Sequence, residues 1–309
     1  MNIDYAKLEK TPRLLAQVNL RPLQGERFQP TGFADLGPAR YQAPDGTEML
    51  LVESAQSVAN RMEAACWDAS KNELIPELVG LPYIVVKGGD QFITASILEA
   101  HRINSEYVMK EADRSDSDFK KKFAQEIGYA ADKPVDWRKF YDGLLKYDPC
   151  SVIHGCFLEE IGGRLRVMRA LSGFIEARQV SIAESGGVKN NIVQPELKAG
   201  EGNVPFPRTE FVAKEITSYF SLDLALIRGF GFNEAATQLL VALSLFKIRR
   251  FLSTGLRLRT ACDLTTSGQL KVDGDLSIPD EKTLLDECSR LIEVSRGSFA
   301  DPTITVVQR

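Results

Sequence analysis

The residues of this 309-residue sequence that could do chemistry form no recognisable catalytic set. The run from Gly229 to Glu234, Gly-Phe-Gly-Phe-Asn-Glu, begins like a dinucleotide-binding loop between a strand and a helix. Glu234 replaces the third glycine and would place a carboxylate against a pyrophosphate, so we do not expect a dinucleotide cofactor. The phosphate-loop, zinc-protease and nucleophile-elbow motifs do not occur. We therefore predict a protein that is not an enzyme.

The histidines and cysteines also argue against a metal or nucleophile site. There are two histidines and five cysteines, and no cysteine belongs to a CxxC pair. We expect His154 in an alternating strand beside Gly155, as a hydrogen-bonded core or edge residue, and His101 near a helix end. The cysteines are expected to be reduced and mostly buried. We predict no cofactor and no metal.

The remaining chemistry is that of binding. The loop from Pro22 to Phe33 has two prolines and two glycines within it or at its ends, and carries Arg27, Phe28 and Gln29. Further arginines and one lysine cluster at Arg164, Arg166, Arg169 and Arg178, and at Lys247, Arg249, Arg250, Arg257 and Arg259. Arginine, aromatic and amide side chains together suit a phosphate backbone and stacked bases, and they equally suit a protein interface.

Composition sets the outer limits. The sequence is 44% apolar and 26% charged, which is typical of a soluble globular protein. No stretch approaches the roughly 20 apolar residues that span a bilayer, and residues 1–10 do not resemble a signal peptide, so we expect a cytoplasmic protein with no membrane partner. The net charge of −4 argues against a uniformly basic nucleic-acid-binding surface, although a basic groove on an acidic body would satisfy it.

Hydrophobic periodicity predicts the elements that position these residues. Strands are expected at Gln17–Arg21, Leu81–Val86, Ser151–Glu159, Arg164–Gln179, Ile216–Ile227 and Leu256–Leu264, and helices at Glu53–Trp67, Thr94–Arg102, Glu234–Thr254 and Glu281–Val294. The sequence from Ser105 to Tyr147 is polar and weakly periodic, which predicts an exposed helical insertion. The turn-rich stretch from Val180 to Glu210 is expected to be a long loop or a protruding hairpin. The order fits a single α+β domain with a ferredoxin-like βαββαβ core and large insertions.

Three segments carry a resemblance to a known family. They are Leu20–Gly37, Val52–Arg61 and Ser96–Asn104, supported by the pair His154-Gly155 and by the strand–Gly-Phe-Gly–helix block near Gly229. Together they resemble the backbone subunit of type I-G CRISPR systems, formerly called type I-U, which belongs to the RAMP superfamily. The resemblance runs over nearly the whole chain and is weakest in the insertion 105–147.

This resemblance implies a hand-shaped protein with an RRM-type palm, fingers from residues 105–147 and a thumb hairpin from residues 180–210. It implies that copies of the chain form a helical homo-oligomer along a CRISPR guide RNA, in a Cascade complex with other subunits. Target DNA would pair with the guide, so that base pairing supplies the sequence specificity and the protein holds the backbone. The implied function is antiviral defence without catalysis.

The resemblance also implies a set of RNA-binding residues. They come from the first loop, the polar face of the following helix and the thumb: Arg21, Gln24, Arg27, Phe28, Gln29, Thr31, Gln56, Ser57, Asn60, Arg61, Lys189, Asn190 and Asn191.

Two other functions stay open at this point. Related type III backbone subunits cut RNA with an aspartate on a palm loop, and Asp35 lies in the first loop here, so a metal-dependent ribonuclease is one alternative. A loop-stabilising role for Asp35 agrees better with its turn-like neighbours. The second alternative is an interaction scaffold that binds no RNA, in which the arginines serve protein interfaces.

Overall fold

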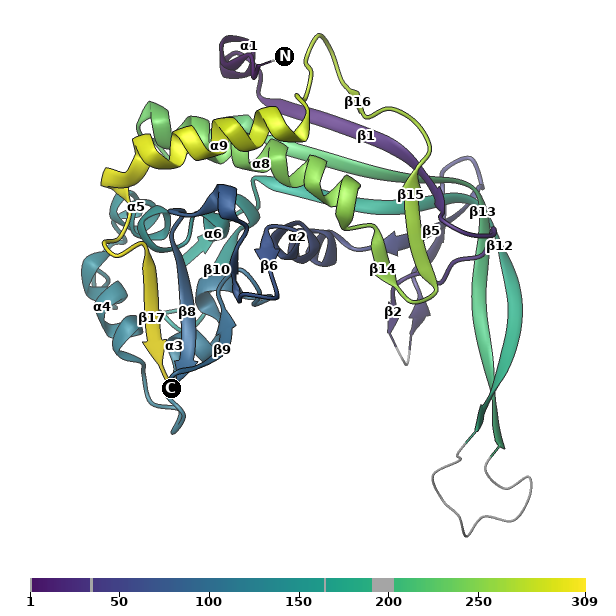
Figure 1. Ribbon diagram of the computed structural model, residues 1–309, viewed down its shortest axis with the longest axis horizontal. Coiled ribbons are helices and arrows are strands. Elements are labelled where there is room, and N and C mark those ends of the chain that lie inside the picture. Colours follow the sequence, from purple (N-terminus) through teal and green to yellow (C-terminus); the bar gives the residue numbers. More distant parts are fainter. Residues whose placement is uncertain (1, 34–35, 164, 191–202) are drawn as a thin grey trace.

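The computed structural model describes residues 2–33, 36–163, 165–190 and 203–309, and of residues 33, 185, 188–190 and 203–207 only the backbone (Figure 1). Helices and two small sheets form a body at one end of the molecule. A long two-stranded hairpin leaves the main sheet at the other end. The architecture is mixed α+β with mainly antiparallel sheets, as the sequence predicted at this level.

The main sheet joins strands from most of the chain. Its order is β14 (Arg257–Arg259), β15 (Cys262–Thr266), β1 (Arg13–Pro22), β13 (Asn203–Asp223), β12 (Leu171–Asn190), β5 (Glu48–Glu53) and β4 (Arg40–Gln42), with β16 (Lys271–Val272) also paired to β1. Every pairing in it is antiparallel. β1 alternates exposed and buried residues over its whole length, so the strand predicted around Gln17–Arg21 is confirmed and is longer.

Three helices lie together beneath this sheet (Figure 1). α2 (Ala55–Ala64) begins after Ser54, whose side chain accepts from the Ser57 amide. α8 (Glu234–Thr254) begins after Asn233, whose side chain accepts from the Ala236 amide, and ends before Gly255. α9 (Glu281–Ser295) packs along α8. The three helices predicted here are confirmed. In each of them the capping residue and the apolar periodicity indicate the same start.

The body holds a smaller sheet and the remaining longer helices. β17 (Ile304–Gln308) pairs parallel to β8 (Tyr83–Gly88), which pairs antiparallel to β9 (Gln91–Ala95). Beside them lie α3 (Glu106–Met109), α4 (Asp118–Glu126), α5 (Trp137–Tyr147) and α6 (Pro149–His154). α4 buries Phe119 and Phe123, so residues 105–147 share the core of the body and are not simply an exposed insertion.

Short elements complete the described part. They are α1 (Tyr5–Glu9), α7 (Leu224–Gly229), the pairs β2 (Gly32–Phe33) with β3 (Gly37–Pro38), β6 (Trp67–Asp68) with β7 (Glu73–Leu74), and β10 (Cys156–Leu158) with β11 (Leu165–Val167), and the 3-10 turns η1 (Pro76–Leu78), η2 (Arg102–Asn104) and η3 (Arg296–Ser298). No helix of the described residues is long and apolar enough to cross a membrane.

Several predicted elements are wrong. The strand expected at Ser151–Glu159 is wrong in its first part: residues 151–154 belong to α6, because Asp148 caps this helix and Pro149 occupies its first turn, and only β10 within this range is strand. The helix expected at Thr94–Arg102 is absent, since β9 runs to Ala95 and turns follow. β13 ends at Asp223, whose side chain caps α7, so the strand does not reach Ile227. The strand expected at Leu256–Leu264 is the hairpin of β14 and β15.

The hairpin is longer than the turn-rich stretch suggested. β12 and β13 pair from Leu171 and Leu222 in the sheet to Asn190 and Asn203 at the far end (Figure 1). Pro205 and Pro207, which indicated a loop, lie within β13. Residues 191–202 fall outside the described part of the chain.

Candidate nucleic-acid interface

The first loop is held to the main sheet by backbone hydrogen bonds. Phe28 exchanges two of them with Phe211 of β13, each 2.9 Å long. The Gln29 amide donates to the Ala261 carbonyl at 2.7 Å, and the Thr31 amide donates to the Val52 carbonyl at 2.9 Å. The loop is therefore a fixed part of the surface beside the main sheet and not a free connector.

The side chains of this loop divide into an outer and an inner set. Arg21, Gln24 and Arg27 are exposed, and Gln29 and Thr31 are half-buried. Phe28 is only 1% exposed, because its backbone pairing with Phe211 turns the ring into the core. The buried ring offers no face to a base, so stacking by Phe28 would require it to leave the core, and its position near RNA stays a prediction.

Arg27 connects the loop to the base of the hairpin. Its Nη1 lies 3.1 Å from Oε2 of Glu210, whose Oε1 lies 3.3 Å from Arg208. The Arg27 side chain is 60% exposed, so this ion pair contributes little to stability and leaves the guanidinium accessible.

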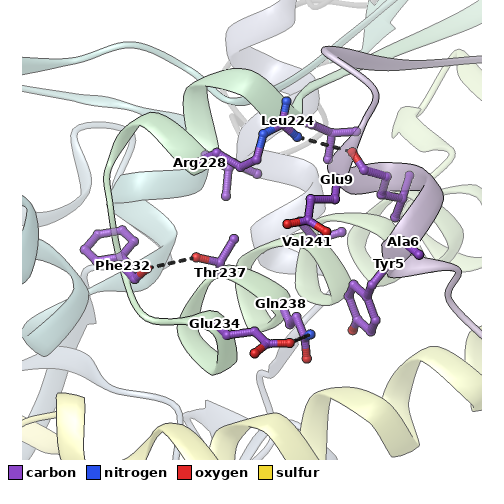
Figure 2. Close-up of a pocket in the computed structure, with 12 residues that line it drawn as sticks. Tyr5, Ala6, Glu9, Leu224, Arg228, Phe232, Glu234, Thr237, Gln238 and Val241 are labelled. Carbon is purple, nitrogen blue, oxygen red and sulfur yellow. Dashed lines mark hydrogen bonds between the residues drawn. The ribbon is translucent and has the colours of Figure 1, made fainter.

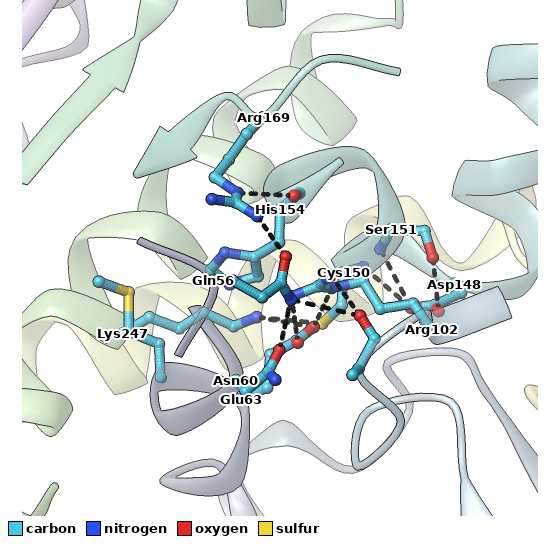
Figure 3. Close-up of polar contacts among 12 residues, drawn as sticks. Gln56, Asn60, Glu63, Arg102, Asp148, Cys150, Ser151, His154, Arg169 and Lys247 are labelled. Carbon is cyan, nitrogen blue, oxygen red and sulfur yellow. Dashed lines mark hydrogen bonds and ion pairs between the residues drawn. The ribbon is translucent and has the colours of Figure 1, made fainter. Parts of the chain in front are cut away.

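The polar face of α2 is hydrogen-bonded rather than freely solvated (Figure 3). Gln56 Nε2 donates to Asn60 Oδ1 at 2.9 Å and to the Ala100 carbonyl at 3.3 Å. Gln56 Oε1 accepts from Arg169 Nη2 at 2.8 Å. Ser57 is half-buried at the start of the helix. Gln56 and Asn60 thus belong to a network that includes an arginine the sequence analysis did not assign to the site.

Arg61 points away from this network. Its guanidinium donates to the carbonyls of Arg257 and Leu258, and its Nε lies 3.6 Å from Glu53 Oε1. Glu53 is buried and also pairs with Arg259. Arg61 therefore fastens α2 to β14, and a phosphate contact would require it to leave these partners.

A buried ionic cluster lies beneath α2 (Figure 3). Arg102 Nη2 is 2.7 Å from Glu63 Oε2, and Lys247 Nζ is 3.9 Å from Glu63 Oε1 and 3.2 Å from Cys150 Sγ. Burial raises the pKa of the Glu63 carboxyl, and Arg102 and Lys247 oppose that rise. Each charge has a partner of opposite sign, which indicates a structural role. Sequence reasoning missed the cluster because its members come from four distant segments with no common spacing.

The side chains of the remaining predicted residues are not described. Lys189 and Asn190 belong to β12, near the far end of the hairpin. Asn191 and Asp35 lie outside the described residues. The five cysteines are free, and all but Cys156 are buried. The described residues contain no group of three histidine, cysteine, aspartate or glutamate side chains that could hold a metal ion.

A separate cavity of about 520 Å³ opens between α1, α7 and α8 (Figure 2). Its polar groups are largely occupied by the protein itself. Arg228 donates to the carbonyls of Leu8 and Thr11, and Glu234 accepts from Gln238. These contacts tie the N-terminal helix to α7 and leave no evident chemistry in the cavity.

Comparison with known proteins identifies the chain. A family model described as CRISPR-associated protein GSU0053 matches residues 14–182, more than half of the sequence. The segment covers the first loop, α2 and most of β12. The protein belongs to this CRISPR-associated family, which confirms the resemblance inferred from the sequence. A search of curated proteins found no match.

Solved structures give a weaker likeness. Two are chains of CRISPR RNA-guided surveillance complexes. The first, from a pre-nicking complex, is 14% identical with a TM-score of 0.41 and coverage of 91% of this chain and 89% of that chain. The second is also 14% identical, with a TM-score of 0.42 and coverage of 91% and 84%. Csc2 of Thermofilum pendens is 13% identical, with a TM-score of 0.30 and coverage of 93% and 76%. The assignment rests on the family match.

Proposed function

We propose that this protein is the guide-RNA-binding backbone subunit of a type I-G Cascade complex, and that copies of it polymerise along the RNA without cutting it. Membership of the CRISPR-associated family over residues 14–182 is the observation that carries the proposal. Guide RNA, other copies of the chain, further Cascade subunits and, through the guide, target DNA are the proposed partners, in the cytoplasm. The protein would hold the backbone while base pairing reads the target.

The strand order supports a ferredoxin-like palm. The neighbours β15, β1, β13 and β12 are the fourth, first, third and second strands of a βαββαβ unit whose helices are α2 and α8. β5 and β4 extend this sheet beyond β12. In this proposal residues 105–147, which contribute α3, α4 and α5 to the body, act as fingers, and residues 180–210 of the hairpin act as the thumb.

The exposed polar residues support an interface between palm and thumb. Arg21, Gln24 and Arg27 are exposed on the first loop, and Arg27 reaches the hairpin base through Glu210. Gln56 and Asn60 lie on α2. Arginines and amides of this kind bind phosphate and sugar groups without reading sequence. An overall charge of −4 is compatible with such a local surface, because binding depends on where charges lie.

Size-exclusion chromatography with absorbance at two wavelengths tests RNA binding. The purified protein is run before and after ribonuclease treatment, and the ratio of nucleic-acid to protein absorbance is followed across the profile. We expect a large RNA-containing species that becomes small after digestion. An RNA-free monomer that also ignores added guide RNA would contradict the proposal and favour the interaction scaffold.

The absence of catalysis needs its own experiment. Assembled complex is incubated with Mg²⁺ and an RNA complementary to the guide, and Asp35→Ala serves as the matched variant. We expect both proteins to leave the RNA intact over the same period. Cleavage by the unaltered protein that Asp35→Ala abolishes would instead establish the ribonuclease alternative.

A further inference from the structure

A small cavity lies beside the polar face of α2, where three segments of the body meet. Its volume is about 250 Å³, below the roughly 300–1,000 Å³ of clefts that hold drug-sized ligands. It is lined by Gln56 of α2, by Arg102, by His154 and Phe157 around β10, and by Arg166 and Arg169 around β11. No carboxylate is among the lining residues. Its size and lining suit a single anionic group.

Arg169 is held in place without having its charge neutralised (Figure 3). Its Nε donates to the His154 carbonyl at 3.1 Å, and its Nη2 donates to Gln56 Oε1 at 2.8 Å. Both acceptors are neutral. Burial, together with the nearby charge of Arg102, lowers the pKa of the Arg169 guanidinium, which means that its positive charge is disfavoured there. An entering anion would relieve this cost.

The contrast with Arg102 shows which charge is available. Arg102 lines the same cavity but forms its 2.7 Å ion pair with buried Glu63. Within the described ranges, neither Arg169 nor Arg166 forms an ion pair. The cavity therefore carries net positive charge.

His154 forms part of the cavity wall without opposing the charge of Arg169. Its side chain is 1% exposed and both ring nitrogens are buried, so it shapes the cavity and offers no open donor to a ligand. Burial and the charges of Lys247, Arg102 and Arg169 hold the pKa of this imidazole well below its usual range, so the ring is neutral. Arg169 therefore faces a neutral wall on the His154 side.

The rim of the cavity offers a surface for a base. The Arg166 guanidinium lies over the Phe157 ring, 5.1 Å from its centroid, and the ring is 39% exposed. Gly155 permits this arrangement. Its φ is +75°, and a Cβ there would lie 2.8 Å from the Val167 carbonyl oxygen and 2.9 Å from the Arg169 amide nitrogen. The close approach brings the segments of Phe157 and Arg169 together.

We propose that this cavity is a nucleotide subsite for single-stranded RNA, in which Arg169 binds one backbone phosphate and the Phe157–Arg166 pair stacks one base. The inference rests on the proposed function, because guide RNA supplies the strand. It adds a contact point on the body side of α2 that none of the residues predicted from the sequence includes, apart from Gln56, which orients Arg169.

Fluorescence anisotropy with a labelled single-stranded RNA of mixed sequence tests the subsite. Arg169→Gln should weaken binding about tenfold and lower the slope of log affinity against log salt by about 0.7, the value for one single-strand phosphate contact. Phe157→Ala should weaken binding about tenfold with an unchanged slope, since stacking is uncharged. The RNA affinity of Arg169→Lys should lie between those of Arg169→Gln and the unaltered protein, because lysine keeps the charge but lacks the planar pair of donors of a guanidinium.

Two controls keep the result interpretable. Arg296→Gln removes an arginine that is 63% exposed on η3, away from the cavity lining, and should change neither affinity nor slope. Urea unfolding of each variant shows whether Arg169→Gln still folds, and Phe157→Ala tests the same subsite from a partly exposed position.

The outcomes separate the possible errors. RNA binding by the unaltered protein that Arg169→Gln and Phe157→Ala both leave unchanged would overturn the subsite but not the proposed function. An unaltered protein that binds no RNA would overturn both. A titration with inorganic phosphate at constant ionic strength, followed by phosphorus NMR, tests whether the cavity binds free phosphate instead of RNA. Phosphate binding that Arg169→Gln abolishes, with equal RNA affinity in the two proteins, would assign the cavity to free phosphate and overturn the RNA subsite.

Discussion

The arginines beneath α2 and those at the surface around it have opposite surroundings. Arg102 is buried and paired with Glu63, in a cluster that Lys247 completes. Arg169 lines the same cavity but is held only by the neutral oxygens of Gln56 and His154. Two arginines that line one cavity therefore differ in whether their charge is neutralised. The paired arginine joins α2 to the body, and the proposed task of the other is to bind an anion.

The largest expected effect is on the paired arginine. Arg102→Met should lower the free energy of unfolding by about 3–5 kcal/mol, because it removes one partner of a buried ion pair and leaves Glu63 short of a counter-charge. Urea denaturation measures this. Arg169→Met is the matched variant and should cost about 1 kcal/mol, the loss of its hydrogen bonds. Equal losses for the two variants would break the comparison.

The second contrast lies between the helical core and the hairpin. Leu243→Ala should lower the free energy of unfolding by about 3 kcal/mol, because Leu243 is fully buried in α8. Ile182→Ala should change it by no more than about 0.5 kcal/mol, because Ile182 is 46% exposed on β12. Thermal or urea unfolding of both variants checks the difference. A large loss at Ile182 would show that the hairpin packs against something in the isolated protein.

The dependence of stability on pH tests an exposed ion pair, in contrast to the buried pair of Arg102 and Glu63. Hydrogen bonds from Lys120 and then Lys110 hold the pKa of Asp116 at about 2, below the ordinary 3.8. A lowered carboxyl pKa stabilises the fold above the ordinary value, and this contribution is lost as pH falls from about 4 to about 2. Asp116→Asn should flatten the loss of stability in that window. Asp132→Asn is the control, and an equal flattening there would contradict the assignment.

The smallest expected effect concerns the first loop. Arg27→Gln should weaken RNA binding by no more than about threefold, because its guanidinium is 60% exposed and shared with Glu210. The loss should be the same for RNAs of different sequence, since phosphate contacts carry no sequence information. Anisotropy titrations with two unrelated RNAs measure it. A loss confined to one RNA would indicate base reading.

Elements with agreeing local signals could be predicted from the sequence. α8 combines an Asn233 cap, an apolar run and Gly255, so its predicted bounds agree with the real ones. β1 shows strict alternation, which predicts the strand but only its second half, since it begins at Arg13. α6 departs from the predicted strand: Val152 and Ile153 are β-branched and favour a strand, but the cap at Asp148 and Pro149 in the first turn favour the helix. The turn signals at Pro205 and Pro207 likewise hid the length of β13.

The site could be predicted only in outline. The sequence predicted that the first loop and the α2 face contribute to a site, but not which of their side chains turn inward. Phe28 is buried because β13 lies beside the loop, and Arg61 is bound by β14, contacts that no local pattern encodes. Arg169 was noted as part of a basic cluster, and only the fold brings it to Gln56. Such contacts depend on tertiary packing between distant segments.

The most direct test of polymerisation along RNA is the mass of complexes formed on guides of increasing length. The protein is mixed with RNAs of one, two and three equal length units, and the mass of each complex is measured in solution. We expect the number of bound chains to rise in proportion to RNA length, and ribonuclease to return the protein to its starting mass. One chain per RNA at every length, or a mass that is independent of RNA, would contradict the account.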